Sequence, residues 1–191
     1  MTPPAPVFPI FLRLAGRQVV LVGGGRVAAT KLEGLIRGGA QVTVVAPEIR
    51  SELEREGVTL LRREFEASDL DGGWFAVAAA TPAVNRQVAD AAEERRIFVN
   101  AVDDPASASA YAGGVFRRGR LTVAISTDGN APALAGLVRE GLEALIPEEI
   151  EAWLELSRSQ AQHWRQTSVP MGERRPLLLA ALNRLYAERA P

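Results

Sequence analysis

The stretch "QVVLVGGGRVAATKLEGLIRGGAQVTVVAP", from Gln18 to Pro47, decides the fold that the sequence predicts. An apolar strand at 18–22 runs into three glycines, a helix follows, and a second apolar strand comes at 41–46. Gly38-Gly39 ends the helix, a position where glycine is favoured. The apolar residues of the helix recur at helical spacing, at Val27, Ala28, Leu32, Leu35 and Ile36. Two strands joined by a helix form a right-handed βαβ unit, so the stretch predicts a parallel sheet.

The alternation of strand and helix continues to residue 102. Further strands are expected at 59–65, 74–80 and 97–102, and the clearest second helix at 83–96. The strands at 74–80 and 97–102 are nearly continuous apolar runs, which are typical of strands buried on both faces. The sequence therefore predicts an α/β fold with a Rossmann-like, doubly wound parallel sheet.

The rest of the chain reads differently. Residues 103–120 are rich in small side chains and end in three arginines within four positions, so we interpret them as a long loop or as a chain leaving the first domain. A strand at 121–127 follows, and Pro132 lies near the start of a helix, where its missing N–H is not needed. Two more helices complete the chain. We expect a Rossmann domain at 1–112, a dimerisation segment at 113–148 and a small C-terminal helical domain at 149–191.

Composition excludes several classes of protein. The chain has 191 residues, 47% hydrophobic, and a net charge of −1, so no global positive field favours nucleic acid. It has no cysteine and only one histidine, His163, so disulfides, thiolate metal sites and a histidine-rich metal centre are not expected. No charged segment precedes an apolar core at the N-terminus, and no apolar run approaches the roughly 20 residues that span a bilayer. We expect a cytoplasmic protein without a resident metal.

The glycines indicate a nucleotide site. Gly23, Gly25 and Ala28 fit the pattern G-x-G-x-x-A between a strand and a helix. The first glycine permits a tight turn, the second lets the backbone approach a pyrophosphate, and the small third residue lets helix and strand pack closely. The helix N-terminus would hold the pyrophosphate, because its free N–H groups and dipole favour anions.

The nucleotide itself stays open at this point, because the usual acidic residue that binds the ribose is missing. Val44, Val45, Ala46 and Pro47 stand at the end of the second strand instead. One alternative is NADP, with Arg26 or Arg50 near its 2′-phosphate. A second is NAD held around Pro47-Glu48, and Glu48 could reach a ribose if the chain turns back. A third is S-adenosylmethionine, which uses a similar loop.

Several separate motifs, in order along the chain, resemble one known family. They are "FPIFLRLAGRQVVLVGGGRVAATK", "GAQVTVVAP", "AAATPAVNRQVADAAEERRIFVNAVDDP", "LTVAISTDGNAPALAGLVREGLEALIP" and "MGERRPLL". Together they are similar to precorrin-2 dehydrogenase, the N-terminal module of siroheme synthase, over nearly the whole chain. That family also lacks the ribose acid after its second strand.

The resemblance implies an activity. The family uses NAD⁺ to oxidise precorrin-2 to sirohydrochlorin, removing two electrons and two protons, and some members then insert Fe²⁺ to make siroheme. It forms a homodimer through the segment after the Rossmann domain, with the tetrapyrrole near the subunit boundary. We therefore expect an NAD-dependent dehydrogenase in siroheme biosynthesis, with ferrochelatase (lyase) activity left open. A non-catalytic, NAD-sensing dimeric regulatory domain is the alternative.

The resemblance also assigns residues. By this resemblance, the key acidic residue of the family is Asp103, in "NAVDD". It follows the fifth strand, where its carboxylate can act as a base. Asp104 is the adjacent candidate, and an Asp-Asp-Pro turn that caps backbone N–H groups is the purely structural interpretation. The NAD site would be lined by Gly23, Gly24, Gly25, Arg26, Val27, Ala28, Pro47, Glu48 and Thr81.

The tetrapyrrole is rich in carboxylates, so its site should be locally basic. The expected substrate-binding residues are Asn100, Arg117, Thr127, Gly129 and Asn130. Arg117 belongs to a sequence cluster with Arg118, Arg120 and Arg139. In "YAGGV" the chain departs from the family, because Gly114 stands at a proline position, and Gly113-Gly114 predicts a looser crossover.

Overall fold

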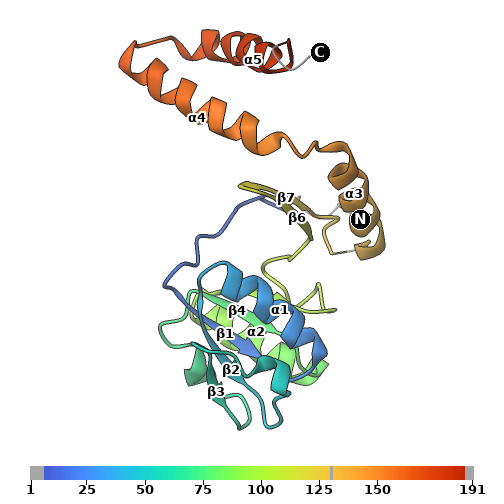
Figure 1. Ribbon diagram of the computed structural model, residues 1–191. Coiled ribbons are helices and arrows are strands. Elements are labelled where there is room, and N and C mark those ends of the chain that lie inside the picture. The colour runs from blue at the N-terminus through green and yellow to red at the C-terminus, as the bar shows by residue number, and fades with distance from the viewer. Residues whose placement is uncertain (1–6, 130, 188–191) are drawn as a thin grey trace, which may run out of the picture. The chain divides into compact units, whose positions relative to one another are not determined.

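A computed structural model describes residues 7–129 and 131–187 (Figure 1). The chain forms two compact units. Unit 1 consists of Met1–Ala112 and Asp128–Ala131, and unit 2 consists of Gly113–Thr127 and Pro132–Pro191. The short segment after residue 127 therefore returns to unit 1 before the chain re-enters unit 2.

Unit 1 contains a five-stranded sheet with the order β3-β2-β1-β4-β5, and every neighbouring pair is parallel. Its strands are β1 (Gln18–Val22), β2 (Gln41–Val45), β3 (Thr59–Leu61), β4 (Phe75–Ala78) and β5 (Phe98–Ala101). Its helices are α1 (Arg26–Arg37) and α2 (Pro82–Glu94), and two 3₁₀ turns, η1 (Ser51–Leu53) and η2 (Ala67–Leu70), lie between strands. The predicted doubly wound α/β fold is confirmed, and β3 is shorter than the sequence suggested.

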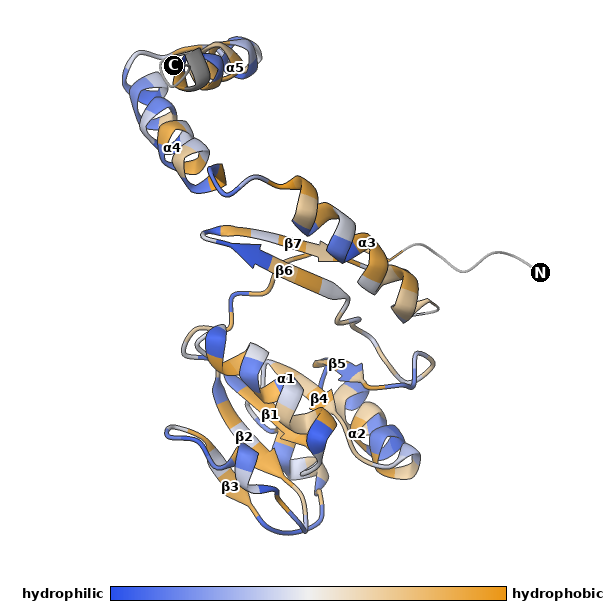
Figure 2. Cartoon of the chain, turned by 45° about the vertical axis from the view of Figure 1, so that its right-hand side comes forward, coloured by the Kyte–Doolittle hydropathy of each residue, from blue (hydrophilic) through white to orange (hydrophobic). Residues whose placement is uncertain are grey.

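The sheet has two buried faces, each covered by one helix. On one face, strand residues such as Leu21 and Val44 pack with Leu32 and Leu35 of α1. On the other face, strand residues such as Val22 pack with buried side chains of α2. Because adjacent strand residues point to opposite faces, burial on both faces explains the nearly continuous apolar runs. Figure 2 shows these strands as the apolar centre of the unit.

Helix α1 ends where its glycines predicted. The backbone N–H of Gly38 donates to Gly34 O at 3.1 Å, and that of Gly39 donates to Ile36 O at 2.8 Å. Gly39 has a φ of 74°, in the left-handed region that glycine adopts without a steric penalty. The turn delivers the chain to β2 beside β1.

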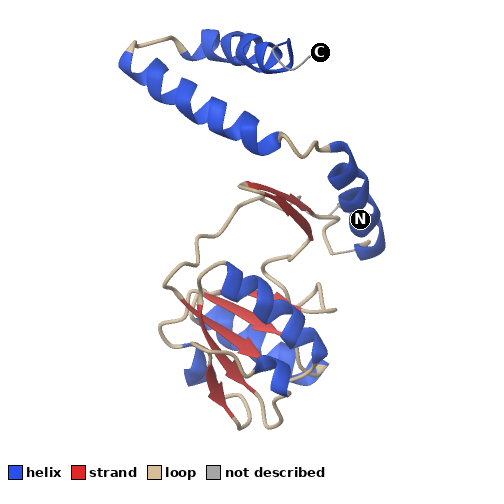
Figure 3. Cartoon of the chain, viewed as in Figure 1, coloured by secondary structure: helices blue, strands red, loops and turns tan. Residues whose placement is uncertain are grey.

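Unit 2 begins with an antiparallel hairpin of β6 (Gly114–Arg118) and β7 (Leu121–Ile125) and continues with three helices (Figure 3). These are α3 (Pro132–Leu145), α4 (Ile150–Gln166) and α5 (Met171–Ala187). Phe116 of β6 and Ala135 of α3 are the buried residues where the hairpin meets α3. The interpretation of 103–120 as a long loop was wrong, because its last part forms β6. The alternative, a chain leaving the first domain, agrees with the start of unit 2 at Gly113.

The expectation of a looser crossover was also wrong. A Cβ atom at Gly113 would overlap the carbonyl oxygen of Ile125, and one at Gly114 would lie 3.1 Å from Ala135 O. The two glycines instead allow a close approach of backbone to backbone where the chain enters unit 2. Within residues 7–129 and 131–187, no helix is long and apolar enough to cross a membrane.

Candidate functional site

The glycine loop between β1 and α1 is shaped by contacts with two neighbouring strand ends. Gly23 has a φ of 128°, and its N–H donates to Val45 O at 2.9 Å. A Cβ atom at Gly23 would overlap Ala79 O, and one at Gly24 would overlap Glu48 O. A Cβ atom at Gly25 would meet no atom within 4 Å. The first two glycines are therefore required by packing, whereas the third leaves open space.

That open space lies at the N-terminus of α1. Gly25 is the N-cap residue, and no side chain caps the helix. The first-turn N–H groups of a helix lack intrahelical partners, and α1 has no acidic residue there to repel an anion. Ala28 is fully buried against the sheet, whereas Arg26 and Val27 are exposed. The loop thus fits the pyrophosphate of a dinucleotide.

Beyond β2 the chain turns back toward this loop. Pro47 and Glu48 are exposed, and the N–H of Arg50 donates to Gly24 O at 3.1 Å. The contact of Gly24 with Glu48 O shows the same proximity. Glu48 and Arg50 therefore lie next to the glycine loop, on the side where the ribose of a bound dinucleotide would be expected.

The side chain of Asn85, which is not among the predicted site residues, connects the segments that follow β4 and β5. Asn85 of α2 is buried; its Oδ1 accepts from the N–H of Ala80 at 2.9 Å, and its Nδ2 donates to Val102 O at 3.4 Å. Thr81 caps α2, accepting from the N–H of Val84 at 3.4 Å. Asn85 lies three residues before the buried Val88, on the same side of α2. A polar residue on the apolar side of a predicted helix was the signal that could have revealed it.

Asp103 follows directly after this link. It is exposed and has a φ of 57°, a left-handed conformation that is uncommon for residues other than glycine. Its side chain has no hydrogen-bond or ion-pair partner among residues 7–129 and 131–187. The carboxylate is therefore accessible at the carboxyl edge of the sheet.

Asp104 has a different environment. Its Oδ2 accepts from Ser107 Oγ at 2.7 Å and its Oδ1 from the N–H of Ser107 at 3.4 Å. The hydrogen bond from the Ser107 hydroxyl lowers the pKa of Asp104. The turn-capping interpretation therefore applies to Asp104, and Asp103 is left for another role.

Two of the expected substrate residues lie in the same unit as Asp103. Asn100 is buried in β5, where its Nδ2 donates to Ala110 O at 3.0 Å while its Oδ1 has no partner among the described residues. Gly129, with a φ of 74°, packs against Pro105 and Tyr111. These contacts bring Asn100 and Gly129 to the segment that follows Asp103. Asn130 lies outside the described residues.

The other two expected substrate residues, Arg117 and Thr127, lie in unit 2. The neighbouring arginines are occupied within unit 2. Arg118 donates to the carbonyl oxygens of Glu143 and Ile146, Arg120 pairs with Glu151 and Glu155, and Arg139 pairs with Glu140 and Glu143. Within the described ranges, Arg117 alone of this cluster has no hydrogen-bond or ion-pair partner.

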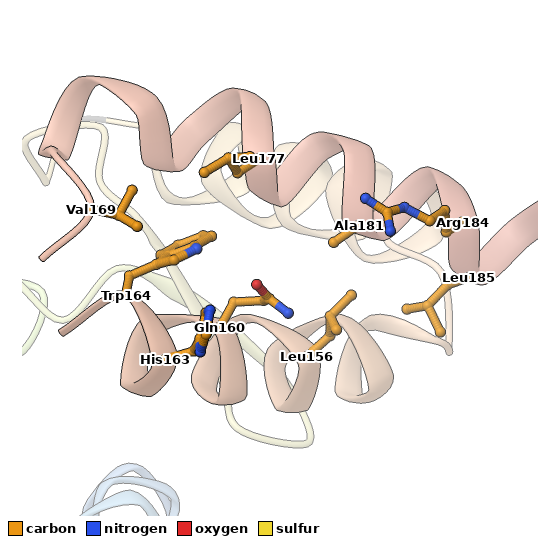
Figure 4. A pocket seen from close by; sticks show the side chains of 9 residues that line it. All are labelled: Leu156, Gln160, His163, Trp164, Val169, Leu177, Ala181, Arg184 and Leu185. Atoms are coloured by element: carbon orange, nitrogen blue, oxygen red, sulfur yellow. The ribbon is translucent and has the colours of Figure 1, made fainter. Parts of the chain in front are cut away.

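Unit 2 also contains a cavity of about 450 Å³ between α4 and α5 (Figure 4). Leucine side chains and Trp164 form much of its wall, and Gln160, His163 and Arg184 add polar groups. None of the residues assigned to the site lines it. In the part of the chain that the structure describes, no group of three or more His, Cys, Asp or Glu residues could hold a metal ion.

Comparison with known proteins identifies two families along the chain. Residues 10–114 match a family described as "Putative NAD(P)-binding". Residues 118–145 match a second family, "Sirohaem biosynthesis protein central". The first match covers most of unit 1, including its glycine loop, and the second runs from the last residue of β6 to the end of α3.

Similar full-length proteins are siroheme synthases. Siroheme synthase 3 of Aeromonas hydrophila is 43% identical over 172 residues, covering 87% of this chain and 37% of the relative. Siroheme synthase 2 of Cronobacter sakazakii is 42% identical over 172 residues, covering 87% of this chain and 38% of the relative. The chain thus spans less than two fifths of the length of these relatives.

Among solved structures, the chain is similar to "SirC, precorrin-2 dehydrogenase". The TM-score is 0.71 and the sequence identity 28%, over 91% of this chain and 88% of that protein. The similarity therefore extends over both units.

Proposed function

This chain belongs to the NAD(P)-binding family found in siroheme synthases, and on that premise we propose that it oxidises precorrin-2 to sirohydrochlorin with NAD⁺. The similarity to a precorrin-2 dehydrogenase over most of both chains supports this activity more directly than the siroheme synthases do, because they are much longer. We place the reaction in the cytoplasm, where NAD⁺ is available.

In this proposal the glycine loop holds the cofactor. Gly25 and the exposed first turn of α1 bind the pyrophosphate, while Pro47 and Glu48 lie along the adenosine side and Thr81 near the end of β4. When bound, NAD⁺ accepts the hydride that leaves the tetrapyrrole. The buried Ala28 keeps α1 close to β1 and thereby fixes the direction in which the free N–H groups point.

The observation that carries the proposed chemistry is the unpaired carboxylate of Asp103 at the carboxyl edge of the sheet. Oxidation removes two hydrogens from precorrin-2, one as hydride and one as a proton. Asp103 accepts that proton as general base, and its exposed carboxylate is accessible to a substrate. Asn85 acts as a positioning residue, since it binds the backbone of Val102 immediately before Asp103.

The remaining site residues would bind the substrate. The unpaired guanidinium of Arg117 would bind a substrate carboxylate. Thr127 would contribute its hydroxyl, and Gly129 would let the substrate come close to the backbone. Asn100 has a buried acceptor without a partner. Asn130 completes the expected set.

We further propose that the chain forms a homodimer. Helix α3 exposes Leu134, Leu137, Val138 and Leu145, which recur at helical spacing, and Figure 2 colours much of this helix as hydrophobic. Exposed apolar residues that gather on one helix favour burial against a second copy of the chain. Insertion of Fe²⁺ as a substrate stays a prediction.

An anaerobic assay tests the dehydrogenase. Wild-type protein, precorrin-2 and NAD⁺ should give sirohydrochlorin and NADH in equal amounts. Asp103→Asn should lose at least 100-fold in turnover, because general base catalysis contributes about 10²–10⁴-fold. Its dissociation constant for NAD⁺, measured by calorimetry, should stay the same. Asp104→Asn is the matched control and should keep most of its activity.

The outcomes separate the alternatives. Full activity of Asp103→Asn would remove Asp103 from the chemistry while leaving the dehydrogenase intact. NAD⁺ binding by folded wild-type protein with no oxidation of precorrin-2 would contradict the enzyme and favour the NAD-sensing regulatory domain.

A further inference from the structure

A group of charged side chains lies just beyond the carboxyl end of β2, next to the glycine loop. Seven charged residues lie between positions 48 and 62, and four of them form two ion pairs, Arg50–Glu52 and Arg62–Glu54. Of the other three, Glu48 lies next to the glycine loop, and Arg55 donates to the backbone oxygen of Glu52 at 3.1 Å. In dinucleotide-binding folds this region reads the adenosine ribose, with an acid for the 2′-hydroxyl of NAD or an arginine for the 2′-phosphate of NADP.

Arg50 has the position expected of a phosphate-binding arginine. Its backbone N–H donates to Gly24 O at 3.1 Å, so the residue is anchored to the loop that would hold the pyrophosphate. Its side chain is about half exposed. Judged by position alone, Arg50 would favour NADP.

The guanidinium of Arg50 is, however, occupied by Glu52. Nη2 donates to Oε1 at 2.8 Å, and Nε lies 3.2 and 3.3 Å from the two carboxylate oxygens. The hydrogen bond from Arg50 lowers the pKa of Glu52 to about 2, so this carboxylate stays charged at neutral pH. Glu52 therefore occupies the Nε and Nη2 donors of Arg50, one of the edges with which a guanidinium binds phosphate.

The second arginine of the group is occupied in the same way. Arg62 donates to Glu54 Oε1 at 2.6 Å and to Ile49 O at 3.3 Å. Glu48 has no ion-pair or hydrogen-bond partner among residues 7–129 and 131–187. With the guanidinium groups of Arg50 and Arg62 paired, the unpaired carboxylate of Glu48 is the charge left next to the glycine loop.

We propose that the Arg50–Glu52 ion pair, together with the unpaired Glu48, makes this site select NAD over NADP. A 2′-phosphate would have to displace Glu52 from Arg50 and would then lie near two carboxylates, whereas a 2′-hydroxyl can donate to Glu48. Because exposed ion pairs are weak, the Arg50–Glu52 pair alone would not exclude a phosphate, and repulsion by the carboxylates supplies the rest. This inference rests on the proposed binding of NAD.

The test measures NAD⁺ and NADP⁺ dissociation constants by calorimetry, without any tetrapyrrole. Wild-type protein should bind NAD⁺ at least about tenfold more tightly than NADP⁺. Glu52→Gln should tighten NADP⁺ binding about tenfold, the scale of one charge-assisted interaction, and change NAD⁺ binding less than about twofold. Adding Arg50→Gln to that variant should abolish the gain, since the freed guanidinium causes it.

Glu54→Gln is the matched control, because it removes a carboxylate of the same segment that is paired with Arg62 rather than Arg50. It should leave the ratio of the two dissociation constants unchanged. An unchanged ratio in Glu52→Gln, or an equal gain in Glu54→Gln, would overturn the inference while wild-type NAD⁺ binding leaves the proposed function intact. Failure of folded wild-type protein to bind NAD⁺ would instead contradict the cofactor of the proposed function.

Discussion

Gly24 and Gly25 are neighbours in the sequence, but an added methyl group would meet different surroundings at each. At Gly24 it would overlap the carbonyl oxygen of Glu48, and at Gly25 it would project into open space at the N-terminus of α1. Gly24→Ala should therefore lower the free energy of unfolding by about 1–3 kcal/mol, the usual cost of overpacking. Urea denaturation followed by circular dichroism measures this loss.

Gly25→Ala is the matched control for Gly24→Ala, because it should change the affinity for NAD⁺ rather than the stability. Its stability should stay within about 0.5 kcal/mol of wild type, while its NAD⁺ affinity should fall about tenfold or more, because the methyl group would lie where the backbone approaches the pyrophosphate. If Gly25→Ala bound NAD⁺ like wild type, the pyrophosphate would not lie at this helix end.

The environment of Asp69 leads to a prediction of how the stability of unit 1 depends on pH. Its side chain is 5% exposed; its Oδ2 accepts from Arg63 Nη1 at 2.9 Å and from the N–H of Glu66 at 2.9 Å. The hydrogen bond from Arg63 lowers the pKa of Asp69, so its stabilisation is fully present above the unfolded-state pKa of about 3.9. It is lost as the pH falls through the lower, folded-state pKa.

Asp69→Asn should accordingly cost about 1–2 kcal/mol at pH 7, since Arg63 is partly exposed and screened. The difference from wild type should shrink as the pH falls below about 4. Urea denaturation at pH 7, 5, 4 and 3 measures it. Asp71→Asn, which alters the more exposed pair with Arg95, should cost less than about 0.5 kcal/mol at every pH.

At the level of elements, the sequence predicted what depends on local patterning. The parallel strands were visible as apolar runs, and α1 ended at its glycines as expected. Strand β6 was missed because Gly113-Gly114 and the arginines do not look like a strand. The signal was the two-residue connection Gly119-Arg120, with Gly119 at a φ of 55°, which is typical of a hairpin turn.

The hairpin gives a prediction for Gly113. A methyl group there would overlap the carbonyl oxygen of Ile125 at the end of β7, so Gly113→Ala should destabilise unit 2 by about 1–3 kcal/mol. NAD⁺ affinity should be unchanged, because the glycine loop belongs to unit 1. Thermal unfolding combined with NAD⁺ calorimetry separates the two effects.

Gly136→Ala is a control with the opposite expected sign. Nothing lies within 4 Å of a Cβ atom at Gly136, which is inside α3, so alanine should stabilise the helix by about 0.5–1 kcal/mol. A stable Gly113→Ala variant would show that the crossover tolerates a side chain after all.

For the candidate site, the sequence indicated which residues could be functional but not which of them contact one another. The glycine loop followed from its spacing, and Asp103 from a resemblance whose assignment of that role stays a prediction. The link by Asn85 and the pairing of Arg50 with Glu52 join groups that a pattern does not connect, because each depends on where the chain turns after a strand. Likewise, three of four clustered arginines proved to be occupied within unit 2.

At the scale of the whole molecule, the proposed homodimer can be tested on α3. Leu137 is 66% exposed and is one of the apolar residues that this helix exposes. Leu137→Asp should convert a wild-type dimer into a monomer, because a charge would be buried in the interface. Analytical ultracentrifugation measures the mass. Ile36→Asp, on the exposed side of α1, is the control and should remain dimeric.

The segment Asp128–Ala131 belongs to unit 1, although the elements on either side of it belong to unit 2. On the ribosome, which delivers the chain from its N-terminus, the β6–β7 hairpin must therefore emerge before unit 1 has all of its residues. Gly129, which packs against Pro105 and Tyr111, arrives only after that hairpin has been synthesised. The last residues of unit 1 therefore leave the ribosome after the hairpin of unit 2, although all five strands of the parallel sheet leave before it.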